Sequence, residues 1–450
     1  MRFKCIFLKR LIFTFIFFIS LYCFLINYLS NDTEKFYKPY SKFWSDNVEL
    51  FFTDEFPLSN SKCNGNFNQY HNKFVTLKNV FIDKSKFVGL KGGELLQTVL
   101  NQSEKLEFFQ YKSGFLSIPC SDHFKEKIHF PLGEINHLNK YYQSLTFYST
   151  DLLDFIPPHV IYEKKVLFVT RNEYANFYHT VTDFYVTFLI CRIMNWSVHD
   201  VHVVFTDAHP WSLLDKVWKD LFPNLSRLSD FSLNNKFIIK EMVWVPFGYI
   251  APIMQLHWPT SPLINEFRDF VLSTYYITAD KSIRKKCDPI SILFIWRRNY
   301  LAHPRNPSGE ISRKIINEAE LFTAVKSASK NDQFLSKFRI DLSERQLENY
   351  SMKNQLEIIS NTSILIAMHG AALTHTLFLP AGAGLVELFP LYYDEKNAHF
   401  KTICKWRGLH YEFFVNKSPK MEMRKFSTYF KPDIIIERVK NIIRKFQCNV

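Results

Sequence analysis

Short continuous apolar runs recur along the chain from residue 165 onward, and glycine, proline or charged residues bound them. They occupy 165–170, 201–205, 237–245, 291–296, 363–368 and 385–389. Runs that are apolar at consecutive positions are typical of strands buried on both faces of a parallel sheet. Helix-type patterns lie between or after them, at 213–221, 318–326, 353–359, 399–406 and 432–446. The pattern therefore predicts an α/β fold in which strands alternate with crossover helices.

The pattern is weaker before residue 160. Short alternating runs at 79–83 and 108–111 predict strands and loops of a first lobe. At 450 residues the chain is too long for one typical core, so we expect two globular units. A charged, turn-like stretch at 279–288 separates the two series of strands, and we place the boundary there. This gives an N-terminal lobe at 61–285 and a C-terminal lobe at 286–450.

The first 60 residues have a different character. Residues 11–29 form an apolar run about as long as the hydrocarbon layer of a bilayer requires. Basic residues precede the run and acidic residues follow it, namely Arg2, Lys4, Lys9 and Arg10, then Asp32 and Glu34. Because positive residues stay on the cytoplasmic side, we expect a single-pass type II signal anchor, with residues 1–10 in the cytosol, a stem at 30–60 and the body in the lumen. A cleaved signal peptide is the alternative, but the run lacks a small-x-small cleavage site.

The composition excludes some kinds of partner and metal site but does not change the predicted fold class. The formal charge of +13 would suit nucleic acid, but the basic residues are scattered and lie beyond a membrane anchor, so we expect no nucleic-acid partner. Six cysteines follow the anchor, an even number that permits disulfides, and none has the spacing of a zinc knuckle. Glycosylation sequons stand at Asn31, Asn101, Asn195, Asn224, Asn349, Asn361 and Asn416.

The stretch at 363–390 holds the main candidate for a ligand site. A predicted buried strand ends at His369 and Gly370, and small residues then begin a predicted helix. Because the first N–H groups of a helix are unpaired and partly positive, Gly370, Ala371 and Ala372 would let a diphosphate approach the backbone closely. Side chains that could donate further hydrogen bonds are His369, Thr374 and His375. Tight packing of the helix on the sheet would explain the same small residues, and the sequence leaves both readings open.

Arg297 and Arg298 follow the strand predicted at 291–296. A guanidinium group suits a diphosphate because its fork matches two oxygens and stays charged. Adjacent strand residues point to opposite faces, so at most one of the two is expected to face a given ligand unless the following loop turns the other inward. Surface arginines on a loop are the alternative.

Three further residues of the predicted N-terminal lobe are candidates for a catalytic role. His179 and Asp183 are four residues apart on a predicted helix that starts near Ala175, so they share one face. Asp207 follows the strand at 201–205, at the carboxyl end where open α/β sheets bind ligands. A histidine held by a carboxylate for structure, or an aspartate that caps a helix, would give the same pattern.

Several of these motifs together resemble glycosyltransferase family 61. The segments are 172–183, 207–211, 297–313 and 369–390, and the phrase His-Gly-Ala-Ala-Leu-Thr-His followed by Leu-Val-Glu-Leu-Phe-Pro is similar to the hallmark of that family. Segments 168–185, 297–305 and 398–411 are most similar to members that add xylose in β1,2 linkage to the core mannose of N-glycans. The resemblance covers roughly residues 160–415. Ala372 stands where the family usually has a second glycine, which matters only if the backbone there needs a positive φ.

The resemblance implies a GT-B-like architecture of two Rossmann-like lobes that face a cleft, with the nucleotide sugar on the C-terminal lobe and the acceptor on the other. It also implies inversion at the anomeric carbon, UDP-xylose as donor, an N-glycan of a glycoprotein as acceptor and residence in the Golgi membrane. Because the sequence contains no Asp-x-Asp triplet, we expect no metal ion. Charge on the leaving UDP would then be neutralised by the helix start, by Arg297 or Arg298, and by His369 or His375.

Two roles remain to be assigned within this expectation. Glu387, at the end of the strand at 385–389, is a candidate for the ribose hydroxyls or else a solvated strand-end carboxylate. Inversion in one displacement needs a base at the acceptor hydroxyl, and the candidates are Asp183, His179 and Asp207. We favour Asp183, with His179 orienting it or exchanging roles with it.

Two other functions stay open. One is a relative in the same family that transfers N-acetylglucosamine from UDP-GlcNAc to a protein-linked serine, threonine or mannose. The other is a catalytically inactive, glycan-binding membrane protein that keeps the fold. The joint presence of Arg297, Arg298, His369 and Glu387 disfavours the second.

Overall fold

The computed structural model describes residues 60–70, 74–120, 144–149, 161–171, 173–231, 235–245, 251–278, 289–393, 396–423, 427–446 and 448. These residues belong to one compact unit, Pro57–Val450. The predicted anchor, the predicted lobe boundary at 279–288 and all but the last residue of the predicted stem lie outside the described residues. Within the described ranges, no helix combines the length and the apolar character needed to cross a membrane.

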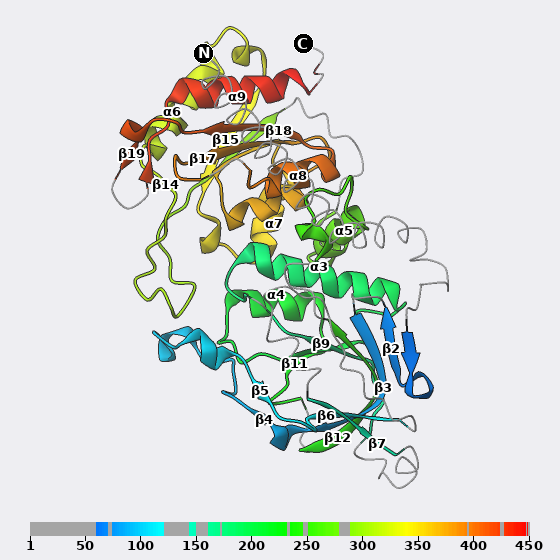
Figure 1. Ribbon diagram of the computed structural model, residues 1–450. Coiled ribbons are helices and arrows are strands. Elements are labelled where there is room, and N and C mark those ends of the chain that lie inside the picture. Colours follow the sequence, from blue (N-terminus) through cyan, green and yellow to red (C-terminus); the bar gives the residue numbers. More distant parts are fainter. Residues whose placement is uncertain are drawn as a thin grey trace, which may run out of the picture. The chain divides into compact units, whose positions relative to one another are not determined.

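A ten-stranded mixed sheet is built from the first half of the described chain (Figure 1). Its main order is β1-β2-β3-β12-β9-β10-β11, while β6 pairs with β3 and β7, and β8 pairs with β12. β12, β9, β10 and β11 run parallel, whereas β3 is antiparallel to β12. The strands are β1 Asn60–Lys62, β2 Phe67–Tyr70, β3 Phe74–Asp83, β6 Leu116–Pro119, β7 Leu145–Tyr148, β8 Ile161–Tyr162, β9 Val166–Val169, β10 His202–Phe205, β11 Leu225–Arg227 and β12 Lys236–Val245; β4 Phe87–Val88 and β5 Gln110–Tyr111 form a separate antiparallel pair.

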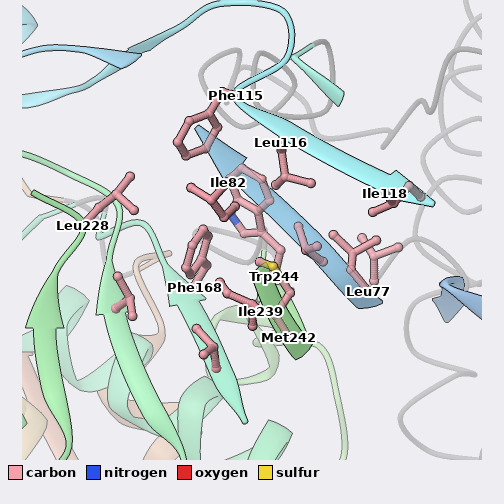
Figure 2. Packing of buried hydrophobic residues seen from close by; sticks show 14 of the residues in the cluster. Leu77, Ile82, Phe115, Leu116, Ile118, Phe168, Leu228, Ile239, Met242 and Trp244 are labelled. Atoms are coloured by element: carbon pink, nitrogen blue, oxygen red, sulfur yellow. The ribbon is translucent and has the colours of Figure 1, made fainter. Parts of the chain in front are cut away.

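The apolar core of this half lies between the long strands and β6 (Figure 2). Phe168 of β9 is opposite Trp244 of β12 in the parallel register, and their rings meet edge to face with centroids 5.6 Å apart. Ile82 of β3 and Leu116 of β6 pack against the same cluster. Burial on both sides of the sheet explains why the strands have continuous apolar runs rather than alternation.

Three helices follow the parallel strands of this half: α3 Phe177–Ile193, α4 Leu213–Leu221 and α5 Ile264–Thr274. The side chains of Asn176 and Ser212 accept hydrogen bonds from the backbone N–H of Tyr178 and Leu214, which fixes where α3 and α4 begin. α3 is buried almost throughout because it packs on β9 and α4 and also on the segment 371–378 of the second half. The start of α3 is therefore held where the two halves of the chain meet.

The second half contains a five-stranded sheet in the order β15-β13-β16-β17-β18, and all neighbouring strands are parallel. Its strands are β13 Ile290–Ile295, β15 Ile340–Arg345, β16 Ile364–Met368, β17 Gly384–Phe389 and β18 His410–Val415. The helices are α6 Glu318–Asn331, α7 Met352–Ser360, α8 His399–Arg407 and α9 Pro432–Arg444, and a small sheet joins β14 Lys314–Ile315, β20 Ser427–Thr428 and β19 Glu422–Met423. 3-10 helices stand at Cys63–Gly65, Lys84–Lys86, Leu96–Thr98, Glu104–Glu107, Pro252–Met254, Leu335–Lys337, Leu347–Asn349, Ala371–Phe378 (η12) and Pro419–Met421.

The mixed α/β class predicted from the apolar pattern is confirmed, and α4 has the predicted bounds. The helix expected after Gly370 is present as a 3-10 helix. Asn317 and Glu320 have the spacing of a capping box, but Asn317 Nδ2 donates to Glu320 Oε2 (3.0 Å) and does not cap the backbone of α6. A disulfide joins Cys63 to Cys120. Asn416 is buried and its Nδ2 donates to Glu422 Oε1 (2.6 Å), so the sequon there is committed to internal packing.

Candidate active site

The turn after β16 lies against the arginine that follows β13. These two strands are parallel neighbours, so both chain segments emerge at the same edge of the sheet. A Cβ built on Gly370 would lie 2.2 Å from Arg297 Nη1, far inside any normal contact. Only a residue without a side chain therefore allows the guanidinium to rest on the backbone at this turn.

A second guanidinium belongs to the same site. Arg297 donates from Nε to the carbonyl of Ser312 (3.3 Å), and Arg313 lies over the ring of Tyr393 at 4.9 Å. Burial, and then repulsion from Arg313, lower the pKa of Arg297. Among the described residues, no carboxylate forms an ion pair with either arginine. Two like charges held together without a counter-ion favour an anionic ligand.

Arg298 takes the opposite direction from Arg297. It is exposed, and its Nη2 lies 2.6 Å from Glu318 Oε2 in an ion pair at the start of α6. The sequence predicted that at most one of these adjacent arginines would face a ligand, and Arg297 is the one at the glycine turn. A hollow of about 540 Å3 opens beside both arginines and is also lined by Lys314 and Glu344.

His369 is held in one orientation at the same turn. Its Nδ1 lies 2.5 Å from Glu387 Oε1, and the hydroxyl of Tyr411 donates to Glu387 Oε2 (2.7 Å). The imidazole also stacks on Phe389, with centroids 4.9 Å apart. Glu387 is fully buried and both of its oxygens accept hydrogen bonds, so its contacts here orient His369. Its predicted role toward a ribose stays a prediction.

The remaining donors predicted for this site divide into two groups. Ala371 and Ala372 are half-buried and precede Leu373, whose N–H donates to the carbonyl of Gly370 (2.9 Å). Their amides therefore come before the first bonded turn of η12 and are available to a ligand. Thr374 and His375 are buried beneath the turn.

Beneath the turn, His375 faces the N-terminal half of the chain. Its Nδ1–H donates to the carbonyl of Ala372 (2.9 Å), and its ring packs on Phe177 with centroids 4.5 Å apart. Burial lowers the pKa of His375 to about 4, so the imidazole is neutral. His375 Nε2 and Thr374 Oγ1 are buried and have no hydrogen-bond partner among the residues that the structure describes.

His179 lies near the start of α3 and approaches the C-terminal half. It is half-buried, and burial lowers its pKa while Glu173 opposes that shift. His399, the first residue of α8, shares a hydrogen bond of 2.7 Å between its Nδ1 and the hydroxyl of Tyr178. Burial, and then the nearby His369 and His179, lower the pKa of His399 to about 4. Three imidazoles from α3, the glycine turn and α8 are thus gathered together, and the sequence analysis did not foresee His399.

Asp183 lies one turn deeper on α3 and is buried. Burial raises its pKa well above the ordinary value of 3.8, and within the described ranges its Oδ2 has no hydrogen-bond partner. No hydrogen bond joins Asp183 to His179 among the described contacts. The shared helix face predicted from their spacing therefore does not produce a paired dyad.

Asp207 is part of a buried ion-pair network. Its two oxygens accept hydrogen bonds from the guanidinium of Arg171 (2.7 and 3.1 Å), which also contacts Asp215 Oδ1 (2.6 Å). Asp215 Oδ2 contacts Arg227 (2.6 Å) in turn. Asp207 is not exposed at all, and Arg171 and His209 outweigh burial and hold its pKa below its usual range. An acceptor hydroxyl has no access to this carboxylate.

The loop between Arg297 and Arg313 also reaches the N-terminal half. His303 Nε2 lies 3.9 Å from Glu173 Oε1, and Arg305 Nη2 lies 3.7 Å from Glu173 Oε2. Arg305 also pairs with Glu104, and the amide of Asn101 donates to the carbonyl of Pro304 (3.0 Å). These residues were not singled out from the sequence, because their partners are more than a hundred residues away.

Within the part of the chain that the structure describes, no group of three or more His, Cys, Asp or Glu side chains is placed to hold a metal ion. The site instead offers guanidinium groups, backbone amides and imidazoles. Such a set can bind a diphosphate and exchange a proton with a neutral hydroxyl group.

Comparison with known proteins agrees with this chemistry. The Glycosyltransferase 61 family model matches residues 152–386. A beta-1,2-xylosyltransferase of Oryza sativa subsp. japonica is 27% identical over 401 residues, which cover 82% of this chain and 71% of that protein. A beta-1,2-xylosyltransferase of Arabidopsis thaliana is 26% identical and covers 82% of this chain and 77% of that protein. An EGF domain-specific O-linked N-acetylglucosamine transferase of Mus musculus is 27% identical over 56% of this chain and 45% of that protein.

Proposed function

This chain belongs to the Glycosyltransferase 61 family, and we propose that it transfers xylose from UDP-xylose, in β1,2 linkage, to the core mannose of an N-glycan. The likeness to two plant beta-1,2-xylosyltransferases over most of the chain supports the choice of sugar. The observation that carries the donor half of the proposal is Arg297 at Gly370 with Arg313 near Arg297, neither having a carboxylate partner among the described residues.

In this proposal the two sheets are the lobes of a GT-B-like enzyme. The diphosphate of the donor lies on the five-stranded sheet, against the amides of Ala371 and Ala372 and the guanidinium of Arg297. Arg313 and His369 border it. Charge that develops on the departing UDP is stabilised by groups already fixed in place, so no metal ion is required.

The chemical step is a single displacement with inversion. The acceptor hydroxyl oxygen forms a bond to the anomeric carbon while the bond from that carbon to the UDP oxygen breaks, and UDP leaves with the electron pair. The hydroxyl proton goes to His179. We prefer His179 to the other two candidates because its lowered pKa keeps the imidazole neutral and because it is half-buried rather than enclosed. Asp207 is closed inside an ion-pair network, and burial favours the protonated form of Asp183.

We further propose that the enzyme is a single-pass type II protein of the Golgi membrane, anchored by residues 11–29. The disulfide between Cys63 and Cys120 supports an oxidising, lumenal environment for the body.

The test uses the purified full-length chain. UDP is expected to raise the melting temperature, because a ligand that binds only the folded state stabilises it. With UDP-xylose and a trimmed N-glycan, one pentose should be added to the glycan, and chelating divalent metals should not slow transfer. Arg297→Ala should remove both the UDP shift and the transfer, while Arg298→Ala is the matched control because its partner is Glu318 at the surface.

Other outcomes would count against the proposal in different ways. Transfer from UDP-GlcNAc to a protein or O-mannose acceptor would instead assign the chain the activity of an N-acetylglucosaminyltransferase of the same family. UDP binding without transfer from either donor would favour an inactive, glycan-binding protein. No UDP shift in the wild type would show that the donor site is wrongly assigned.

A further inference from the structure

Trp211 is exposed, whereas the other tryptophans described in this half of the chain are buried. Its exposed fraction is 40%, whereas Trp218 and Trp244 are at most 1% exposed. Its backbone is fixed, because its N–H donates to the carbonyl of Glu94 (2.9 Å). An indole left open to water on a fixed backbone is a common anchor for a ligand that has one apolar face.

The indole borders a hollow of about 460 Å3 at the β11 edge of the ten-stranded sheet. The loop at 91–94 also lines this hollow. A Cβ on Gly92 would lie 2.9 Å from Ala208 Cα, and one on Gly93 would lie 2.8 Å from Arg227 Nε; both glycines also have positive φ (+79° and +82°). The loop is thus built to lie close to the strand ends, and the hollow has the volume of a small-ligand site.

Both basic groups that line this hollow are already paired with carboxylates. Arg227 Nη2 contacts Asp215 (2.6 Å), and Lys91 Nζ contacts Asp230 at the mouth (3.1 Å). Among the described residues, this arrangement contrasts with Arg297 and Arg313, which have no carboxylate partner. A phosphate would have to compete with these carboxylates, so the hollow favours a neutral ligand.

One acceptor in this wall is unsatisfied. Glu94 Oε1 accepts from the N–H of Gly92 (3.1 Å), but Glu94 Oε2 is buried and finds no hydrogen-bond partner in the described part of the chain. A buried carboxylate oxygen without a donor is costly, and a ligand hydroxyl would supply the donor. A sugar ring offers hydroxyl donors on its edge, which suit Glu94, and C–H groups on its face, which suit the indole of Trp211.

We propose that this hollow is a carbohydrate subsite, in which a neutral sugar ring of the acceptor, other than the one that is modified, stacks on Trp211 and donates a hydroxyl to Glu94. The assignment of the ring to an acceptor rests on the proposed function. The segment from Asp207 to Trp211 links the hollow to His209, whose ring stacks on Tyr174 (4.5 Å), itself in ring contact with His303 of the C-terminal half. One short segment thus spans from the hollow to the region where the two halves meet.

The kinetic test compares a long acceptor with a short one. The full-length chain is assayed with the free pentasaccharide core of an N-glycan and with methyl β-mannoside. Trp211→Ala should raise KM for the pentasaccharide about tenfold, as expected for the loss of one aromatic contact of ~1.4 kcal/mol, and leave KM for methyl β-mannoside and UDP-xylose unchanged. Glu94→Gln should act in the same direction. Leu213→Ala is the matched control, because Leu213 is two residues away and 72% exposed.

A binding measurement separates this proposal from the proposed function. In saturation-transfer NMR, the pentasaccharide should receive magnetisation from the wild type and from Leu213→Ala but much less from Trp211→Ala. That result would hold even if no transfer occurred with UDP-xylose. Equal signals from all three proteins, or an equal rise in KM for the short and the long acceptor, would overturn the subsite. A Trp211→Ala protein whose UDP-induced melting shift is lost would point to damaged folding and likewise count against it.

Discussion

Gly370→Ala is the sharpest perturbation of the proposed donor site, because it adds one carbon atom at a defined contact. The new Cβ would start 2.2 Å from Arg297 Nη1, so the guanidinium has to withdraw by about 1 Å to reach an ordinary contact of 3.4 Å. The backbone there is extended and accepts alanine, so the whole effect falls on Arg297. Because the side chain of Arg297 is flexible and can move away, the cost in folding free energy should stay below about 1 kcal/mol.

The cost to ligand binding should be much larger. A hydrogen bond to a charged group contributes about 1.5–3 kcal/mol, and a displacement of about 1 Å breaks its geometry. Gly370→Ala should therefore weaken UDP binding roughly 10- to 100-fold, measured by titration calorimetry on the full-length chain. Arg297→Ala should lose a similar amount.

A double-mutant cycle isolates the cause. Once Arg297 is alanine, the Cβ at position 370 no longer displaces a guanidinium, so adding Gly370→Ala to Arg297→Ala should cost almost nothing further. If Gly370→Ala binds UDP as tightly as the wild type, or if the two losses simply add, then Arg297 does not act through this turn and the reasoning is refuted.

Three other perturbations test separate parts of the structure. His179→Gln should lower kcat by roughly 10²- to 10⁴-fold without changing UDP affinity. In the wild type, the activity should decline with acid only below pH 6.5, because burial lowers the pKa of His179 and the neutral base is lost as pH falls through that lowered pKa. Asp183→Asn should become more stable than the wild type as pH rises above 3.8. The pKa of buried Asp183 is raised in the folded state, so the wild type loses stability with increasing pH. Equal urea midpoints for the two proteins at every pH would contradict this. Replacing Cys63 and Cys120 by serine should cost up to about 4 kcal/mol of unfolding free energy, because the bridge closes a separation of 57 residues, and a chain insensitive to reductant would argue against it.

The local chemistry of the turn could be predicted because it is encoded in adjacent residues. The apolar run into Gly370 shows where β16 ends, and strand alternation correctly separates Arg297 from Arg298. The 3-10 geometry of η12 could not be predicted, because a helix-type composition fits both kinds of helix. The orientation of His369 by Glu387 required the register of β16 and β17, which pairs residues some twenty positions apart.

The partners of the charged residues could not be predicted from the sequence. Asp207 has the same position after a strand as a catalytic carboxylate would have, and only the fold brings Arg171, 36 residues earlier, onto both of its oxygens. Arg313 entered the sequence prediction only as the end of the family-like segment 297–313, although its guanidinium belongs with Arg297. Whether a charge is paired depends on which distant strands meet at one edge of a sheet, and the sequence pattern does not show which strands are neighbours.

Pairing of charges distinguishes the two sheets more sharply than their composition does. At the edge of the ten-stranded sheet, Arg171 and Arg227 are matched by Asp207 and Asp215, so the buried charges cancel inside the protein. Such a network gains nothing from a further anion and would lose a counter-ion to it. At the edge of the five-stranded sheet, Arg297 is desolvated beside another arginine, and an anion is the one partner that removes both the burial cost and the repulsion. An anionic donor is therefore expected on the second sheet, which leaves the first to a neutral acceptor.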